Sequence, residues 1–170
     1  MTRWIEYVKF NRPLVRAYKE TDSLNFILVD GGAAGELPEP FNVAKSVITA
    51  IRFEPRGAQT VSKADADIYI DGGLWSEDTD KSLHIGYDPS TSSICQPNNE
   101  FLKNFDDNFG ILKRKTVNKI KVRVRSIDSC LKQKEIPLPN FIKLDVHSAE
   151  LPALIGSSGG GLKKLCRPFS

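Results

Sequence analysis

The sequence contains few cysteines, and their spacing is unlike that of a disulfide framework or a metal site. Cys95, Cys130 and Cys166 are odd in number and far apart, and no Cys-x-x-Cys pair is present. This pattern is typical of reduced cysteines in a cytoplasmic protein. The sequence therefore predicts no metal site.

Long hydrophobic runs are also missing. No apolar stretch approaches the roughly 20 residues that a membrane-spanning helix needs. The N-terminal segment MTRWIEYVKF lacks the apolar core of a signal peptide. We therefore expect a cytoplasmic protein without a membrane partner.

Charge of one sign is in only slight excess, with a net charge of +3. Seven Lys or Arg residues lie between positions 113 and 125, but no aromatic residues are interleaved with them as in readers of single-stranded nucleic acid. An anionic glycan, phosphate or nucleic acid is one interpretation of this stretch. A solvated strand face is favoured, and a nucleic-acid partner is not expected.

Length and composition are those of one ordinary globular domain. The chain has 170 residues, of which 40% are hydrophobic and 26% are charged. This length is enough to bury a sizeable core. We assign residues 25–165 to the domain, residues 1–24 to an N-terminal extension and residues 166–170 to a tail.

Short apolar segments alternate with helix signals, which predicts an α/β fold with a doubly wound, mostly parallel sheet. Strands are expected at residues 26–30, 51–54, 66–71, 82–86, 118–127 and 141–146. Helices are expected at residues 13–20, 43–50, 97–109, 127–131 and 149–155, with Ser126 capping the fourth.

A glycine-rich turn and an acid mark the ends of the first two strands. Strand 26–30 runs into Gly-Gly-Ala-Ala-Gly, and strand 51–54 ends on Glu54. The glycines predict bare backbone N–H groups that a ligand can approach closely. An acid at the same edge of a parallel sheet can accept hydrogen bonds from a ribose diol. Together they predict an adenosine-type pocket, and the spacing alone leaves the class of cofactor open.

A second candidate group follows strand 141–146. Asp145 ends a nearly continuous apolar run, where an acid is costly unless it has a partner or a function. His147 is a candidate general base at the same place. An ordinary loop histidine is the alternative interpretation.

The chain resembles the FkbM-type methyltransferases in five blocks that occur in the same order. The likeness covers roughly residues 24–165, and generic Rossmann proteins lack STSSICQPN and KLDVHSAEL. The blocks are VDGGAAGELPEPF, IRFEP, GLWSEDTDKSLHIGYDPSTSSICQPN, VRVRSIDSCL and FIKLDVHSAELPALIGS. The resemblance implies the class I, Rossmann-like methyltransferase fold, S-adenosylmethionine as cofactor, and O-methylation of a small-molecule or glycan hydroxyl.

The resemblance also implies a role for each candidate residue. Carboxylates near the cofactor suit its sulfonium cation, whereas they would repel the pyrophosphate of a dinucleotide. The turn beside the methionine part of the cofactor would be formed by Asp30, Gly32, Ala33 and Gly35, and Glu54 would bind the ribose hydroxyls. The adenine would be bordered by Asp71, Gly72 and Leu74. Asp145 and His147 would lie at the site of methyl transfer.

Two other functions remain open at this point. One is an NAD-dependent oxidoreductase with a degenerate glycine-rich turn, and the other is a catalytically inactive binding fragment. The family fold continues with about three more strands, for which we find no sequence after strand 141–146. We therefore expect a sheet that lacks its last strands and self-association through the exposed edge of that strand.

Overall fold

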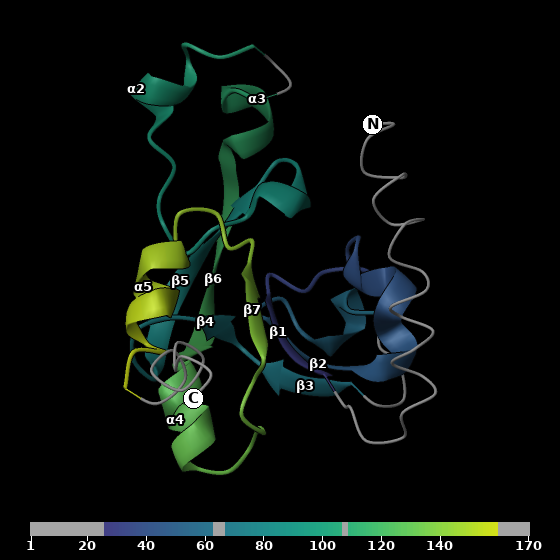
Figure 1. Cartoon of the computed structure of the whole chain (residues 1–170). Helices are drawn as coiled ribbons and strands as arrows, with labels where there is room; N and C mark the ends of the chain where they lie inside the picture. The colour runs from purple at the N-terminus through teal and green to yellow at the C-terminus, as the bar shows by residue number, and fades with distance from the viewer. Residues whose placement is uncertain (1–25, 63–66, 107–108, 160–170) are drawn as a thin grey trace.

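The computed structural model describes residues 26–62, 67–106 and 109–159 (Figure 1). The helix expected at residues 13–20 lies outside them. Among the helices of these residues, none has the length and hydropathy of a membrane span.

The main sheet has four parallel strands in the order β3-β2-β1-β7. They are β1 (Phe26–Gly31), β2 (Ile48–Glu54), β3 (Ile68–Asp71) and β7 (Phe141–Leu144). The four apolar runs thus form the expected parallel sheet, which is consistent with a Rossmann-like methyltransferase fold. β7 is an edge strand of this sheet as described, and self-association through it stays a prediction.

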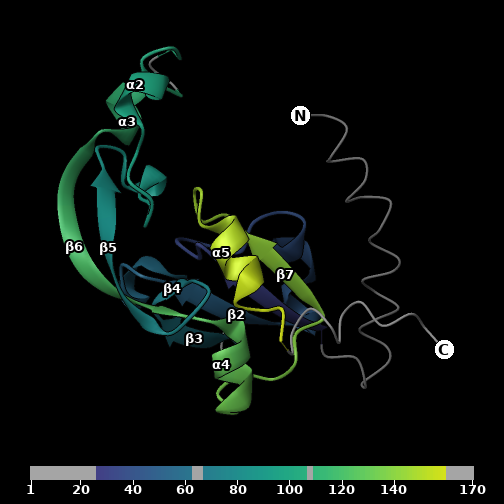
Figure 2. The ribbon, with the colours of Figure 1, turned by 90° about the vertical axis from the view of Figure 1, so that its left-hand side faces the viewer.

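Each face of the main sheet packs against its own apolar cluster, because neighbouring residues of a strand point to opposite faces. Val29 and Ile51 pack with Ile127 and Ala153, which belong to α4 (Ile127–Lys132) and α5 (Glu150–Ile155). The other face packs Leu28 and its neighbours against the 3₁₀ helix η1 (Phe41–Val47). Figure 2 shows α4 and α5 together in front of the main sheet.

The connection between β1 and β2 contains a 3₁₀ helix, η1, instead of the helix expected at residues 43–50. η1 ends at Val47, and Ile48 already belongs to β2, which therefore begins three residues before the expected strand. The reason is the run Val-Ile-Thr at positions 47–49, since β-branched side chains favour an extended backbone.

A second sheet has the order β4-β6-β5. Its strands are β4 (Gly73–Leu74), β5 (Thr79–Gly86) and β6 (Thr116–Arg125), and β5 and β6 form a long antiparallel ribbon (Figure 2). Apolar and basic residues alternate along residues 119–125, which favours a strand with one buried apolar face and one solvated basic face; Val122 and Val124 are buried accordingly, but Ile120 and Arg125 depart from this pattern. Ile120 is exposed, whereas Arg125 is buried and pairs with Asp78 and Glu135.

The remaining helices are short. α2 (Asn99–Leu102) and α3 (Ile111–Arg114) lie at the far end of the ribbon, so the helix expected at residues 97–109 is one turn long (Figure 1). η2 (Ala58–Thr60) and η3 (Pro89–Thr91) are 3₁₀ turns in loops. The expected cap of α4 is confirmed, since the Ser126 hydroxyl accepts a hydrogen bond from the Ser129 N–H.

Candidate active site

A pocket lies at the carboxyl ends of the main-sheet strands. Its walls come from the turn after β1, the tip of β2, β4, η3 with the residues after it, and the turn after β7. Five of the candidate residues line it: Gly32, Glu54, Leu74, Asp145 and His147. The other five candidates, Asp30, Ala33, Gly35, Asp71 and Gly72, do not line this pocket.

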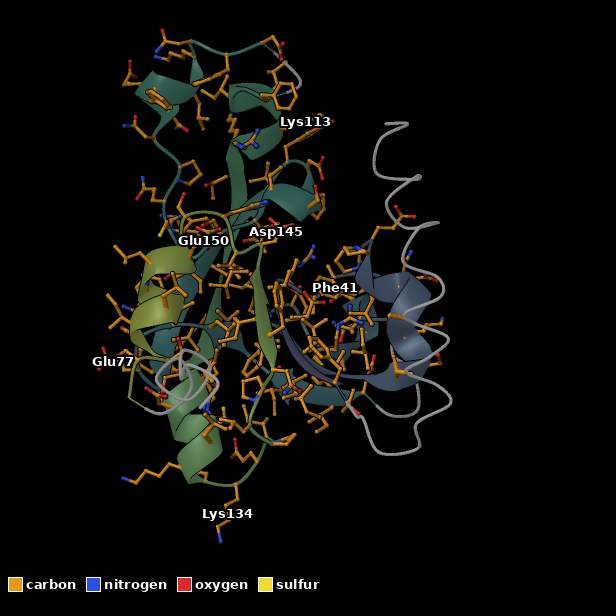
Figure 3. The ribbon with its side chains drawn as sticks, in the orientation of Figure 1. Phe41, Glu77, Lys113, Lys134, Asp145 and Glu150 are labelled. Carbon is orange, nitrogen blue, oxygen red and sulfur yellow. The ribbon has the colours of Figure 1, made fainter. Side chains whose placement is uncertain are left out.

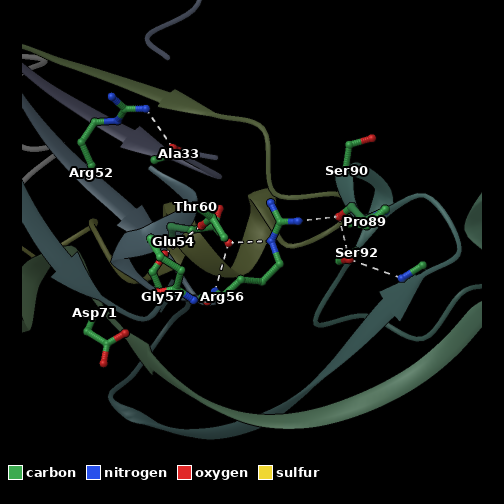
Figure 4. Close-up of polar contacts among 12 residues, drawn as sticks. Ala33, Arg52, Glu54, Arg56, Gly57, Thr60, Asp71, Pro89, Ser90 and Ser92 are labelled. Carbon is green, nitrogen blue, oxygen red and sulfur yellow. Dashed lines mark hydrogen bonds and ion pairs between the residues drawn. The ribbon is translucent and has the colours of Figure 1, made fainter. Parts of the chain in front are cut away.

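Arg52 organises the glycine-rich turn from beneath. Its side chain is fully buried in the middle of β2, where it donates a hydrogen bond to the Ala33 carbonyl at 2.8 Å (Figure 4). It donates another to the Gly35 carbonyl at 3.0 Å. It also donates to the Ser62 carbonyl at 3.0 Å. One guanidinium group therefore fixes the turn that borders the pocket. Sequence reasoning missed Arg52 because it stands inside the apolar run Ile-Arg-Phe.

Asp30 is a buried partner of two cations and does not line the pocket. Its carboxylate lies 3.0 Å from Nε of Arg52 and 3.0 Å from Nζ of Lys143. Burial raises the pKa of Asp30, and the nearby charges of Lys143 and Arg52 oppose this rise. Asp30, rather than Asp145, is therefore the buried acid that needs charged partners.

Three backbone N–H groups of the turn are already paired, contrary to the expectation of bare N–H groups from sequence. Gly32 and Ala33 both donate to the Phe53 carbonyl, and Gly35 donates to the Thr60 carbonyl. Gly32 has φ +76°, and a Cβ there would lie 2.1 Å from the Asp145 carbonyl oxygen. Glycine is thus required at position 32 because the backbones of Gly32 and Asp145 approach each other closely.

Glu54 is held at the tip of β2, facing the pocket. It is buried, and its Oε1 accepts hydrogen bonds from the Arg56 N–H at 3.0 Å and from Nε of Arg56 at 2.9 Å. Arg56 also donates to the Pro89 carbonyl at 3.0 Å, so it ties η3 to β2 (Figure 4). Within the described ranges Oε2 of Glu54 has no hydrogen-bond partner, which leaves it available to a ligand. Arg56 was another residue that sequence reasoning missed, although it follows Glu54 by two positions.

Of the residues expected to border the adenine, Leu74 lines the pocket, whereas Asp71 and Gly72 do not. Leu74 is buried in the pocket wall. The Asp71 carboxylate accepts a hydrogen bond from the Tyr69 hydroxyl, which also reaches the Glu54 carbonyl at 3.0 Å. Burial and Asp71 raise the pKa of Tyr69 to about 12. Gly72, with φ +135°, lies against the backbone of Arg123.

Asp145 stands just beyond β7, at the rim of the pocket (Figure 3). Its side chain is 64% exposed, so the expectation of an acid ending a buried strand is wrong. The reason is that β7 ends at Leu144, two residues before the expected end. The Asp145 carboxylate lies 3.6 Å from Nε2 of His147, a contact that becomes an ion pair when the imidazole is protonated.

The turn after β7 contains two consecutive residues with left-handed backbones, His147 at φ +47° and Ser148 at φ +74°. This conformation costs about 1–2 kcal/mol per residue for side chains with a Cβ. We expect Ser148→Gly to raise the free energy of unfolding by about 1 kcal/mol and the melting temperature by about 2–4 °C.

Thermal unfolding followed by circular dichroism tests this expectation. Ser82→Gly, in the extended strand β5, is the matched control and should lower stability instead. A Ser148→Gly protein less stable than the parent would contradict the strain assigned to this turn.

The protein-family comparison agrees with this geometry. The Methyltransferase FkbM domain family matches residues 44–169, which is most of the chain. The chain belongs to this family. Members of the FkbM family use S-adenosylmethionine, so the protein is an S-adenosylmethionine-dependent methyltransferase. No curated protein and no solved structure matches the chain significantly.

The FkbM match begins after the glycine-rich turn and covers the other six candidates: Glu54, Asp71, Gly72, Leu74, Asp145 and His147. The assignment of that turn to the site therefore depends on its position in the fold. In residues 26–62, 67–106 and 109–159 no cluster of His, Cys, Asp and Glu side chains could hold a metal ion.

Proposed function

We propose that the pocket binds S-adenosylmethionine with Glu54 on the ribose hydroxyls and transfers the methyl group to a hydroxyl oxygen of a small-molecule or glycan acceptor. The observation that carries the proposal is the hydrogen bonding of the Glu54 carboxylate. Arg56 fixes one carboxylate oxygen, and the other has no described partner at the pocket wall. A preorganised carboxylate suits a ribose diol because charged acceptors form strong hydrogen bonds.

The remaining walls fit the other parts of the cofactor. Leu74 supplies an apolar surface for the adenine in the same pocket as Glu54, and Asp71 and Gly72 precede Leu74 in the chain, at the end of β3. Asp30 acts on the methionine turn indirectly, through Arg52 and the carbonyls of Ala33 and Gly35. Gly32 forms the pocket wall at this end.

The transfer site is placed at Asp145 and His147. S-Adenosylmethionine supplies a methyl group on a sulfonium cation, which the Asp145 carboxylate would attract. Methylation of a hydroxyl also requires a proton acceptor, and the His147 imidazole at the pocket rim is the candidate for that task. Asp145, 3.6 Å away, would stabilise the resulting imidazolium. Ser90 and Arg56 line the same pocket, and their polar groups suit a hydroxyl-rich acceptor.

We expect Asp145→Asn to reduce methyl transfer by about tenfold or more while the melting temperature stays within a few degrees. The side chain is exposed, so its loss removes charge from the transfer site without opening a cavity. Transfer of a labelled methyl group to a panel of sugars and small hydroxyl compounds measures the first effect, and thermal unfolding measures the second.

Asp80→Asn is the matched control, because Asp80 is an exposed acid of β5 that pairs with Lys121 outside the pocket. An Asp145→Asn protein that transfers methyl at the parental rate would remove Asp145 from the mechanism. Amine and carbon acceptors are added to the panel, and methyl transfer to one of these instead of to a hydroxyl would overturn the proposed oxygen acceptor.

A further inference from the structure

The left-handed turn at His147 and Ser148 is held in place by a distant segment of the chain. Two adjacent left-handed residues that are not glycine persist only where the surroundings fix them, and such turns concentrate at functional sites. The bracing segment is Ser93 to Cys95, which is more than fifty positions away in the sequence.

Ser93 is the centre of this brace. Its backbone pairs with His84 of β5 through two hydrogen bonds of 2.8 and 3.1 Å, and its side chain is buried. The hydroxyl donates to the His147 carbonyl and accepts from the Cys95 N–H at 3.0 Å. Both hydrogen-bonding functions of the hydroxyl are therefore used, and its direction is fixed.

Cys95 holds the next residue of the turn. Its Sγ lies 3.5 Å from the Ser148 carbonyl oxygen, within hydrogen-bonding distance of a thiol donor. Burial raises the pKa of the Cys95 thiol, which keeps the proton on sulfur. The two consecutive carbonyls of the strained turn thus both accept hydrogen bonds from one segment.

The imidazole of His147 has little support of its own. In the described part of the chain its polar contact is with Asp145, whose carboxylate is mostly exposed. The direction of the imidazole consequently depends on the His147 backbone, whose carbonyl is held by the Ser93 hydroxyl.

We propose that Ser93 is a positioning residue, which orients His147 toward Asp145 and the pocket by holding the His147 carbonyl. This inference rests on the proposed function, in which His147 receives the acceptor proton. Removing the hydroxyl leaves the His147 carbonyl without its donor and releases the turn. The imidazole would then leave the neighbourhood of Asp145, while Glu54 and Leu74 stay in place to bind the cofactor.

The chain contains only two histidines, so magnetic resonance of a histidine-labelled protein reports on His147 directly. His147→Gln assigns the two resonances. In Ser93→Ala we expect the His147 imidazole resonance to move toward the position of a free histidine, and binding of S-adenosylhomocysteine to persist. Ser82→Ala, at an exposed position of β5, is the matched control and should leave the His147 resonance unchanged.

The results for Ser93→Ala and for the parent protein test the positioning role of Ser93 and the proposed function separately. An unmoved His147 resonance in folded Ser93→Ala overturns the positioning role, whatever happens to methyl transfer. Failure of the parent protein to bind S-adenosylhomocysteine counts against the proposed function and leaves the brace itself intact.

If Ser93→Ala does not fold, the same measurement is made on Ser93→Ala/Ser148→Gly, in which glycine relieves the left-handed backbone at position 148. The His147 resonance should still be displaced in this double variant, and Ser148→Gly alone should keep it in place. A parental resonance in the double variant overturns the inference.

Discussion

Replacing Arg52 with alanine is expected to lower the free energy of unfolding by about 3–5 kcal/mol, because it breaks a buried ion pair by removing one partner. The guanidinium is fully buried beside Asp30, and it also serves three backbone carbonyls. Domains have a net stability of only about 5–15 kcal/mol. We therefore expect partial or complete unfolding at room temperature, measured by urea denaturation.

Two variants separate the causes of this loss. Arg123→Ala, at an exposed position of β6, controls for the charge and should change stability by no more than about 0.5 kcal/mol. Arg52→Lys keeps the charge but not the planar fork, and we expect an intermediate loss because one ammonium group cannot replace all the hydrogen bonds of Arg52. If Arg52→Ala unfolds at the parental urea concentration, the turn does not depend on this residue.

The second large effect is expected at Glu54. Glu54→Gln should weaken binding of S-adenosylhomocysteine by tens-fold to over a hundredfold, which corresponds to about 2–3 kcal/mol for hydrogen bonds to a charged group. The carboxylate is buried and already oriented by Arg56, so the amide loses charge at a position that does not rearrange. Isothermal titration calorimetry measures this change in affinity.

The partner of Glu54 provides the control. Arg56→Ala removes the contacts of the guanidinium with Oε1 of Glu54 and with the Pro89 carbonyl but keeps the carboxylate. We expect this variant to retain more affinity than Glu54→Gln. Equal losses in both variants would mean that the tie between β2 and η3, and not a contact of Glu54 with ribose, determines binding. An unchanged dissociation constant in Glu54→Gln would remove the residue from the site.

The position of Asp145 illustrates the limit of sequence patterns. The run FIKLDV indicates a strand whose last residues are buried, but β7 ends at Leu144 and Asp145 is mostly exposed. Its backbone N–H still donates to the Gly31 carbonyl, and this contact keeps Asp145 at the pocket although its side chain is mostly exposed and lies 3.9 Å from Nζ of Lys143 in β7. The exposure of a residue at a strand end depends on which other segments cover that end, and the sequence of the strand does not determine those segments.

The sequence by itself determined the parallel sheet, the cap at Ser126 and the position of Glu54 at a strand tip. These features follow from local signals, because the spacing of apolar residues and helix capping both depend on residues that are close in the chain. Tertiary structure alone decided that Arg52 holds the glycine-rich turn and that Ser93 holds His147. Those contacts join residues 19 and 54 positions apart, and a buried guanidinium or hydroxyl takes its partners from whichever backbone groups the folded chain brings within reach.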